Sequence, residues 1–253
     1  MRISRRDFLS LGISAGATLV GSGRLGAQGV PDPSHRPVID APILAEDGAA
    51  VPIQVSVDHP MEPDHYIRQI EVILDSDPVP LKGVYRFTPD NGRAWIAFQM
   101  RSGVGGLLRA VVECNRHGKF VGTKEVRVAE GGCTMAPDKV ARDRIGHPML
   151  RVGRAGRAGE IVEVRAKVNH GSYTGLTIRE GKIVRERPEF FVKQLRVYLD
   201  QQLISDFRLT SAVSPNPLFR FPVKVSGAGL LRVVFVNNEG QTWEAGQPIQ
   251  PGA

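Results

Sequence analysis

The sequence predicts an all-β fold, because its apolar residues fall in short alternating runs and rarely in long helical patterns. Gln54, Ser56 and Asp58, for example, alternate with aliphatic residues, which is the period of a strand with one buried face. Turn sequences that are poor in strand interiors bound the runs, such as Pro-Asp-Asn-Gly at 89–92. Together with a long internal repeat, this pattern favours two immunoglobulin-like antiparallel β-sandwich domains joined by a cysteine-bearing linker.

The internal repeat indicates that the two halves have similar folds. Ile67–Asp75 is echoed by Val192–Asp200 at an offset of 125, and Gly106–Val112 is echoed by Gly229–Phe235 at an offset of 123. Because the two offsets nearly agree, two similar domains are the simplest account. We therefore expect one domain over residues 46–130 and a second over residues 159–253.

The N-terminal residues 1–27 are expected to be an export signal. Arg5 and Arg6 precede a mildly apolar run from Leu9 to Val20, the order found in twin-arginine signal peptides. The run is shorter than the roughly 20 apolar residues that span a bilayer. We expect export to the periplasm, a mature chain that does not insert into a membrane, and a flexible proline-rich lead-in over residues 28–45.

The charge of the mature chain argues against a nucleic-acid partner. The whole chain has a formal net charge of +7, and the signal contributes +3, from four arginines against Asp7, which leaves +4. An excess of this size on an exported protein suits acidic proteins or small anions better than nucleic acid.

The chain has two cysteines, and their surroundings differ. Cys114 ends a strand-like run on the face that carries Leu108, Ala110 and Val112, so we expect a buried and inert core thiol. Cys133 follows Gly131 and Gly132. Two glycines give the backbone freedom and allow another protein to approach closely. We therefore expect Cys133 to be the working atom of the protein and the glycine pair to be a flexible arm.

We expect a linker over residues 131–158, which includes Cys133. Pro137 could start, and Gly146 end, a short helix over Asp138–Ile145, although a helix of this length is marginal unless it packs. The arginines of the segment either keep it soluble or attract an anionic cargo or an acidic partner; they are Arg142, Arg144, Arg151, Arg154 and Arg157.

The histidines give little sequence signal. His59 and His170 end matching strand-like runs in the two halves, so we expect structural or interfacial roles for them. His35, in the proline-rich lead-in, and His117, in a turn, point to no function.

His-Pro-Met at 59–61, Gly-Gly-Cys at 131–133 and further motifs in the second half resemble those of the sulfur-substrate carrier of the periplasmic thiosulfate-oxidising (Sox) pathway. The first half resembles its Y subunit through His-Pro-Met at 59–61, His-Tyr-Ile at 65–67 and Gly-Gly-Cys at 131–133. The second half resembles the Z subunit through Ser211–Phe221 and the Asn-Glu-Gly turn at 238–240. A fused chain of this kind is similar to the SoxYZ-like carriers found alongside quinoprotein (PQQ) dehydrogenases.

The resemblance implies a carrier that is not an enzyme. Cys133 would hold a small sulfur anion covalently and present it to Sox-type enzymes or to a quinoprotein dehydrogenase system, with no cofactor. One difference matters, because the carrier cysteine of the separate subunits lies at a free carboxyl terminus, whereas here a second domain follows.

Three alternatives remain open at the level of sequence. A periplasmic copper-binding protein could use Cys133, Met135, His147 and Met149, since thiolate and thioether ligands suit Cu(I); otherwise no metal site is expected. A thiol enzyme could pair Cys133 with His147 or His170. A disulfide between Cys114 and Cys133 is compatible with the periplasm.

Overall fold

A computed structural model describes residues 33–129, 132 and 144–252. Every described strand belongs to the compact unit that spans residues 31–253. The predicted signal peptide lies outside the described residues. So do Gly131, Cys133 and nearly all of the expected helix near 138–145.

The described residues form strands joined by turns, with two short 3-10 turns, η1 (Pro33–His35) and η2 (Pro89–Asn91). The strands of the first half are β1 (Pro37–Asp40), β2 (Leu44–Ala45), β3 (Val51–Val57), β4 (Ile67–Leu74), β5 (Leu81–Phe87), β6 (Ala94–Met100), β7 (Gly106–Cys114) and β8 (Gly118–Val128). Those of the second half are β9 (Gly146–Val152), β10 (Glu160–Asn169), β11 (Leu176–Arg179), β12 (Lys182–Arg185), β13 (Val192–Leu199), β14 (Gln202–Leu209), β15 (Leu218–Val225), β16 (Gly229–Asn237) and β17 (Thr242–Ile249).

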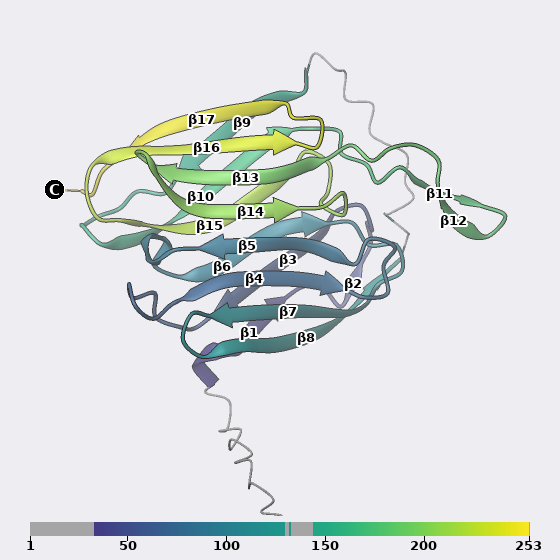
Figure 1. Cartoon of the computed structure of the whole chain (residues 1–253), viewed down its shortest axis with the longest axis horizontal. Helices are drawn as coiled ribbons and strands as arrows, with labels where there is room; N and C mark the ends of the chain where they lie inside the picture. The colour runs from purple at the N-terminus through teal and green to yellow at the C-terminus, as the bar shows by residue number, and fades with distance from the viewer. Residues whose placement is uncertain (1–32, 130–131, 133–143, 253) are drawn as a thin grey trace, which may run out of the picture. The chain divides into compact units, whose positions relative to one another are not determined.

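Two large sheets contain strands of both halves (Figure 1). The order of the six-stranded sheet is β1-β3-β6-β15-β10-β9, and that of the nine-stranded sheet is β17-β16-β13-β14-β5-β4-β7-β8-β2. The halves join where β5 pairs with β14, from Gly83 opposite Leu209 to Phe87 opposite Ser205, and where β6 meets β15. Apart from a short parallel pairing of β2 with β8, neighbouring strands are antiparallel. The prediction of an all-β, immunoglobulin-like antiparallel fold is confirmed.

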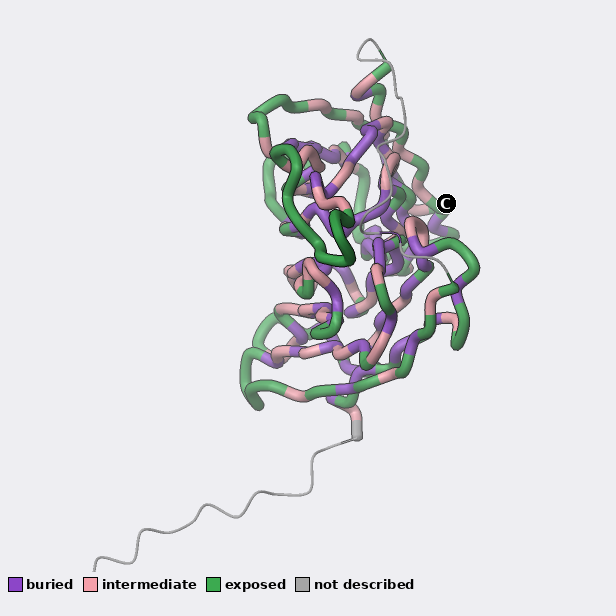
Figure 2. The backbone as a smooth tube through the Cα atoms, turned by 90° about the vertical axis from the view of Figure 1, so that its right-hand side faces the viewer, coloured by how far each residue is buried: buried purple, intermediate pink, exposed green. Residues whose placement is uncertain are grey.

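One hydrophobic core runs through both halves. In the strands of the two large sheets, alternation places buried side chains on the inner face, as β3 shows with its buried valines and isoleucine. Figure 2 shows buried stretches of backbone gathered in the interior of the body. At the seam, the ring of Tyr85 lies 5.0 Å from that of Phe98 on the facing sheet and 5.5 Å from that of Phe207 in the second half. Because aromatic packing continues across the seam, the two halves are parts of one folded body.

Two segments differ from expectation. The proline-rich lead-in contributes β1 and β2 to the sheets, and part of the expected linker forms β9, which pairs with β10. Both segments alternate along an edge strand: β1 buries Pro37 and Ile39, and β9 half-buries Pro148, Leu150 and Val152. No helix in the described part of the chain has the length and apolar character needed to cross a bilayer.

Candidate functional site

Four histidines and a cysteine meet at one end of the first half. His35 ends η1, the short purple turn beneath β1 and β8 in Figure 1. His59 follows β3, and His65 lies in a tight turn where it pairs with Glu62. Cys114 is the last residue of β7, and His117 lies in the turn to β8. The antiparallel sandwich therefore brings together five side chains that are far apart in the sequence.

Four ring nitrogens of this cluster form a closed ring. His59 Nε2 lies 3.1 Å from both His35 Nε2 and His65 Nε2. His117 Nδ1 closes the ring at 3.1 Å from His65 Nε2 and 2.9 Å from His35 Nε2. Neighbouring imidazole rings have centroids 4.4–4.8 Å apart, whereas those of His35 and His65 are 5.8 Å apart. His35 and His65 are therefore opposite corners of a four-membered arrangement.

The thiol of Cys114 lies beside this ring, on its buried side. Cys114 Sγ is 3.7 Å from His117 Nδ1 and 4.0 Å from His59 Nε2, and it accepts the backbone N–H of Arg116 at 3.4 Å. Cys114, His35 and His59 are buried, whereas His65 is half-buried and His117 is exposed. The cluster thus begins in the core and reaches the surface.

Neighbouring groups orient the buried rings. His59 Nδ1 lies 2.5 Å from the carbonyl oxygen of Pro60. Since only an N–H can bond to a carbonyl, this contact places the proton on Nδ1 and leaves a lone pair on Nε2, which faces the other histidines. The ring of His35 stacks on Phe120 with centroids 4.5 Å apart, and Ser34 Oγ lies 3.2 Å from His35 Nδ1.

The two turns that carry His65 and His117 are bound to each other. Asn115 Nδ2 donates to the carbonyl oxygen of Asp64 at 3.0 Å, and Asn115 Oδ1 accepts the backbone N–H of Tyr66 at 2.9 Å. The guanidinium of Arg116 donates to the carbonyl oxygen of Asp64 and pairs with its carboxylate. These bonds fix the histidines relative to one another before any ligand arrives.

Sequence reasoning missed this cluster. The prediction that Cys114 is a buried core residue is confirmed, but its neighbours include histidines at hydrogen-bonding distance. His35 and His117 are part of the cluster although their sequence context gave no signal. The available signal was two closely spaced pairs, His59 with His65 and Cys114 with His117. Both pairs lie at the ends of runs that become neighbouring strands. The fold was needed to show that the pairs meet.

A second candidate region surrounds Gly132, which directly precedes Cys133. Gly132 is buried, its N–H donates to the carbonyl oxygen of Ser102 at 2.7 Å, and its own carbonyl oxygen accepts from the Arg101 guanidinium at 2.9 Å. A Cβ at this position would lie 1.8 Å from the carbonyl oxygen of Gly48. The expected flexible arm is therefore not free at Gly132, because close packing and two backbone hydrogen bonds hold this glycine. Cys133 and Gly131 lie outside the described residues.

Arg101 connects this region to the second half. Its guanidinium also donates to the carbonyl oxygen of Ser172 at 2.8 Å, and its backbone N–H donates to that of Ala212 at 2.6 Å. The buried ammonium of Lys82 donates to the carbonyl oxygen of Arg101 at 3.0 Å and to Asp77 Oδ2 at 2.6 Å. A buried polar network thus holds the residue before Cys133 at the seam between the halves.

The histidine cluster and Gly132 lie at opposite ends of β7. Cys114 pairs with Gly118 at one end of the β7–β8 ladder, and Gly106 pairs with Val126 at the other. Gly132 is bound to Ser102, which precedes that other end. A strand of nine residues spans roughly 27 Å. The two regions are therefore separate sites.

The residues of the copper alternative do not form a cluster in the described part of the chain. His147 and Met149 lie on β9 with exposed side chains, and Cys133 and Met135 are outside the described residues. The partner proposed for a thiol enzyme, His170, is buried, and its Nδ1 lies 2.9 Å from Ser172 Oγ. Burial lowers the pKa of His170 to about 4, so this imidazole is neutral at physiological pH.

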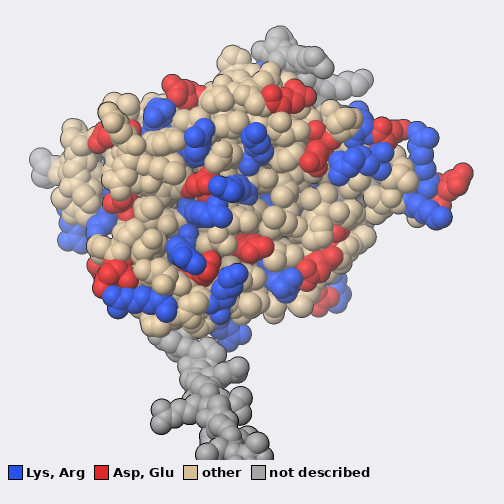
Figure 3. Space-filling model, viewed as in Figure 1, with Lys and Arg blue, Asp and Glu red and all other residues tan. Residues whose placement is uncertain are grey.

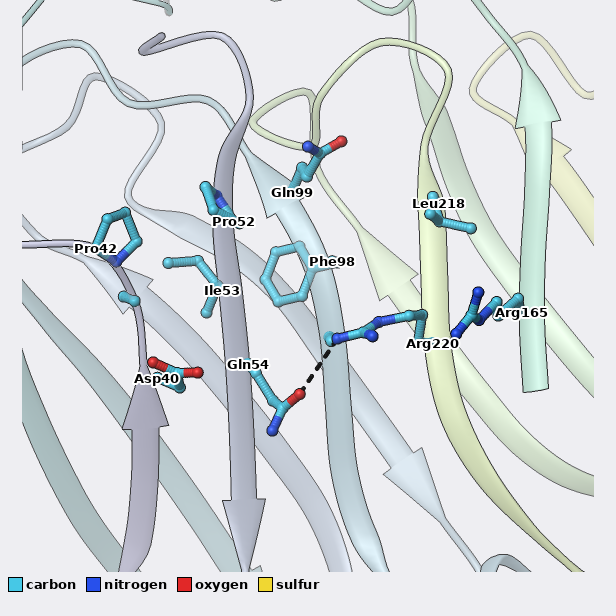
Figure 4. A pocket seen from close by; sticks show the side chains of 12 residues that line it. Asp40, Pro42, Pro52, Ile53, Gln54, Phe98, Gln99, Arg165, Leu218 and Arg220 are labelled. Atoms are coloured by element: carbon cyan, nitrogen blue, oxygen red, sulfur yellow. Dashed lines mark hydrogen bonds between the residues drawn. The ribbon is translucent and has the colours of Figure 1, made fainter. Parts of the chain in front are cut away.

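A shallow hollow of about 620 Å³ lies on the six-stranded sheet where the halves join (Figure 4). Arg220 from β15 reaches across it toward Gln54 on β3, with Nη2 and Oε1 3.4 Å apart. Pro42, Ile53 and Phe98 supply apolar walls. On the face seen in Figure 3, acidic and basic side chains are interspersed. The hollow is lined by residues of both halves, and its lining contains no group of chemically reactive side chains.

Comparisons with known proteins assign a family to each half. The family model of sulfur oxidation protein SoxY matches residues 24–133, and that of sulphur oxidation protein SoxZ matches residues 150–248. No curated protein matches the chain. A solved superoxide reductase (neelaredoxin) from Ignicoccus hospitalis is 31% identical over 37% of this chain and 80% of its own, with a TM-score of 0.34. A marsupial T cell receptor is 10% identical over 85% of this chain and 72% of its own, with a TM-score of 0.26.

Proposed function

Because the chain belongs to the SoxY and SoxZ families of sulfur oxidation proteins, as a fusion of the two, we propose that it is a periplasmic carrier that holds a small sulfur anion on Cys133. The carrier itself catalyses no reaction. Its partners are sulfur-oxidising enzymes of the Sox type, or a quinoprotein dehydrogenase system, which load the anion and then process it. Export through the twin-arginine pathway delivers the folded fusion to those partners.

The observation that carries this proposal is where the SoxY match ends. It closes at Cys133, directly after a glycine whose position is fixed at the seam of the two halves. A carrier thiol needs a defined base, so that partner enzymes meet it at a constant place on the surface. Arg101 supports that base by bonding to both Gly132 and Ser172.

The chemistry of loading sets a requirement for the partner. Joining the Cys133 thiolate to the sulfane sulfur of an anion such as thiosulfate forms one sulfur–sulfur bond and releases two electrons. The loading enzyme must therefore pass these two electrons to an acceptor. Reduction by a dithiol reverses the reaction and releases the cargo.

Intact mass spectrometry of the chain purified from its native periplasm tests the carrier proposal. We expect a mass increase that matches a sulfur-containing adduct, that disappears on treatment with dithiothreitol, and that peptide mapping assigns to Cys133. Cys133→Ser should abolish the adduct, whereas the matched variant Cys114→Ser should retain it. An unmodified mass in both the wild type and Cys114→Ser would contradict the proposal.

A further inference from the structure

We propose that His35, His59, His65, His117 and Cys114 form a mononuclear iron site, with four imidazole nitrogens around the ion and the thiolate as a fifth ligand. The proposal rests on the geometry of the described residues at the far end of β7. It is independent of the carrier function proposed for Cys133.

Hydrogen bonds alone do not explain the ring of nitrogens. Each ring nitrogen carries either one hydrogen or one in-plane lone pair. A closed ring of four nitrogens, with sides of 2.9–3.1 Å, has four short contacts. Two hydrogens at alternate corners can satisfy only two of these contacts. One cation at the centre satisfies all four lone pairs at once.

The distances fit a metal ion. The centre of a square with sides of 3.1 Å lies about 2.2 Å from each corner, close to the length of a bond between a metal ion and an imidazole nitrogen. Cys114 Sγ, at 3.7–4.0 Å from two of the nitrogens, reaches a metal–thiolate bond of about 2.3 Å after an approach of about 1 Å. The backbone N–H of Arg116 already donates to this sulfur, and such a contact orients a ligand atom of a metal site.

The orienting contacts are those that metal sites require. A ligating histidine usually donates its second ring N–H to a carbonyl or a carboxylate. His59 does so to the carbonyl oxygen of Pro60, which leaves Nε2 available. The hydrogen bonds between the turns of Asp64 and Asn115 hold the two outer histidines in place.

The donor set favours iron over the other common ions. Zinc in structural sites takes four ligands in a tetrahedron, and Cu(I) is selected by soft thiolate and thioether ligands, whereas four of the five donors here are imidazoles. Four nitrogens and a cysteine thiolate are also the donors of thiolate-bound haem iron, with imidazoles here in place of the macrocycle. An iron ion with these five ligands retains a sixth coordination position.

The sixth position defines the class of ligand. The thiol lies on the buried side of the nitrogens, and the exposed His117 and half-buried His65 place the cluster at the surface. A small anion or a diatomic molecule can reach an ion there without displacing a protein ligand. Azide is a suitable probe of this position.

The test uses the full-length chain, loaded with Fe(II) without oxygen and freed of excess metal. We expect about one tightly bound iron per chain. Ferricyanide should take one electron from it, giving Fe(III) and ferrocyanide, and a visible absorption band from thiolate-to-iron charge transfer should appear. Azide should shift this band. His35→Ala and His59→Ala should weaken iron binding by more than about tenfold.

Matched variants separate the site from other thiols and histidines. Cys114→Ser should remove the band, whereas Cys133→Ser should keep it. His117→Ala should weaken binding, whereas the exposed His147→Ala should not. The proposal is overturned if the wild type binds no iron, if zinc or copper occupies these residues and iron does not, or if the band survives in Cys114→Ser. A failed carrier test leaves every one of these results unaffected.

Discussion

Corresponding ends of the two halves are closed in different ways. These ends lie at opposite ends of the nine-stranded sheet, because β7 and β16 run in opposite directions. In the first half, His59 follows β3 and β7 ends at Cys114, with His59 Nε2 and Cys114 Sγ 4.0 Å apart. In the second half, the corresponding strands β10 and β16 end before His170 and at Asn237, with His170 Nε2 and Asn237 Nδ2 3.5 Å apart. A histidine is thus present at this position in both halves, but among the described residues a thiol lies beside it in the first half alone.

The two halves also differ at a third position, which is His65 in the first half and Phe190 in the second. The offset of 125 between the repeats places Phe190 where the first half has His65. Phe190 stacks on His170 with ring centroids 4.2 Å apart, so this end of the second half is closed by ordinary packing and by the contact of His170 with Ser172. The fold therefore does not need a cluster of metal-binding side chains to close this end. The cluster in the first half calls for a chemical reason.

Replacing first-half residues of the cluster with their second-half counterparts should have the largest effect on stability. His65→Phe combined with Cys114→Asn copies the second-half residues into the first half, so it should remove the stabilisation that iron gives. With free iron at 1,000 times its dissociation constant, that stabilisation is about 4 kcal/mol. Urea unfolding with Fe(II) and with a chelator, both without oxygen, measures the difference.

The reverse exchange is the control. Phe190→His combined with Asn237→Cys should gain no stability from iron, because the second half has no described counterparts of His35 and His117 beside His170. Iron-dependent stability in this variant, or its survival in the first, would show that the difference between the halves does not concern a metal.

Much of the fold followed from the sequence. Alternation and turn residues predicted the strands, and the repeat predicted two similar halves. Two features could not be predicted from the sequence. One is the pairing of β5 with β14, and the other is that Pro37–Asp40 and Gly146–Val152 are strands. Both form only when the assembled sheets offer an edge to pair with. Short edge segments carry too little alternation to be recognised alone.

The candidate sites were harder to predict. Cys114 was correctly predicted to be buried, because its side chain shares the inner face of β7. Its histidine neighbours come from segments far apart in the sequence, and no local pattern reports such a meeting. Gly132 was interpreted as a source of freedom, whereas the structure shows that the missing Cβ makes room for the carbonyl group of Gly48.

A second prediction uses pH to compare the histidines. Burial lowers the pKa of His170 from 6.5 to about 4, so between these values the unfolded chain binds a proton that the folded chain does not. Stability should therefore fall as pH falls through this window, by up to about 3 kcal/mol from this residue. Urea unfolding of the metal-free protein at several pH values measures the slope.

The readout is the slope, because a substitution at a buried site also changes stability at every pH. His170→Gln should flatten the slope between pH 6.5 and 4, whereas His147→Gln, at an exposed position, should leave it unchanged. An equal slope in wild type and His170→Gln would mean that other groups control acid stability.

The smallest expected effect concerns the other end of β7, at Gly132. Gly132→Ala would place a Cβ 1.8 Å from the carbonyl oxygen of Gly48, and a backbone atom cannot move aside as a flexible side chain can. Overpacking of this kind costs about 1–3 kcal/mol. Gly227→Ala is the matched control, because nothing lies within 4 Å of its Cβ position, and it should change stability by less than about 0.5 kcal/mol. Urea unfolding of both variants measures the cost.

If the two variants lose equally little stability, Gly132 is not held at the seam, and the defined base that we propose for Cys133 does not exist. Iron binding at the opposite end of the strand should be unchanged in both variants, since additivity holds between sites more than about 10 Å apart.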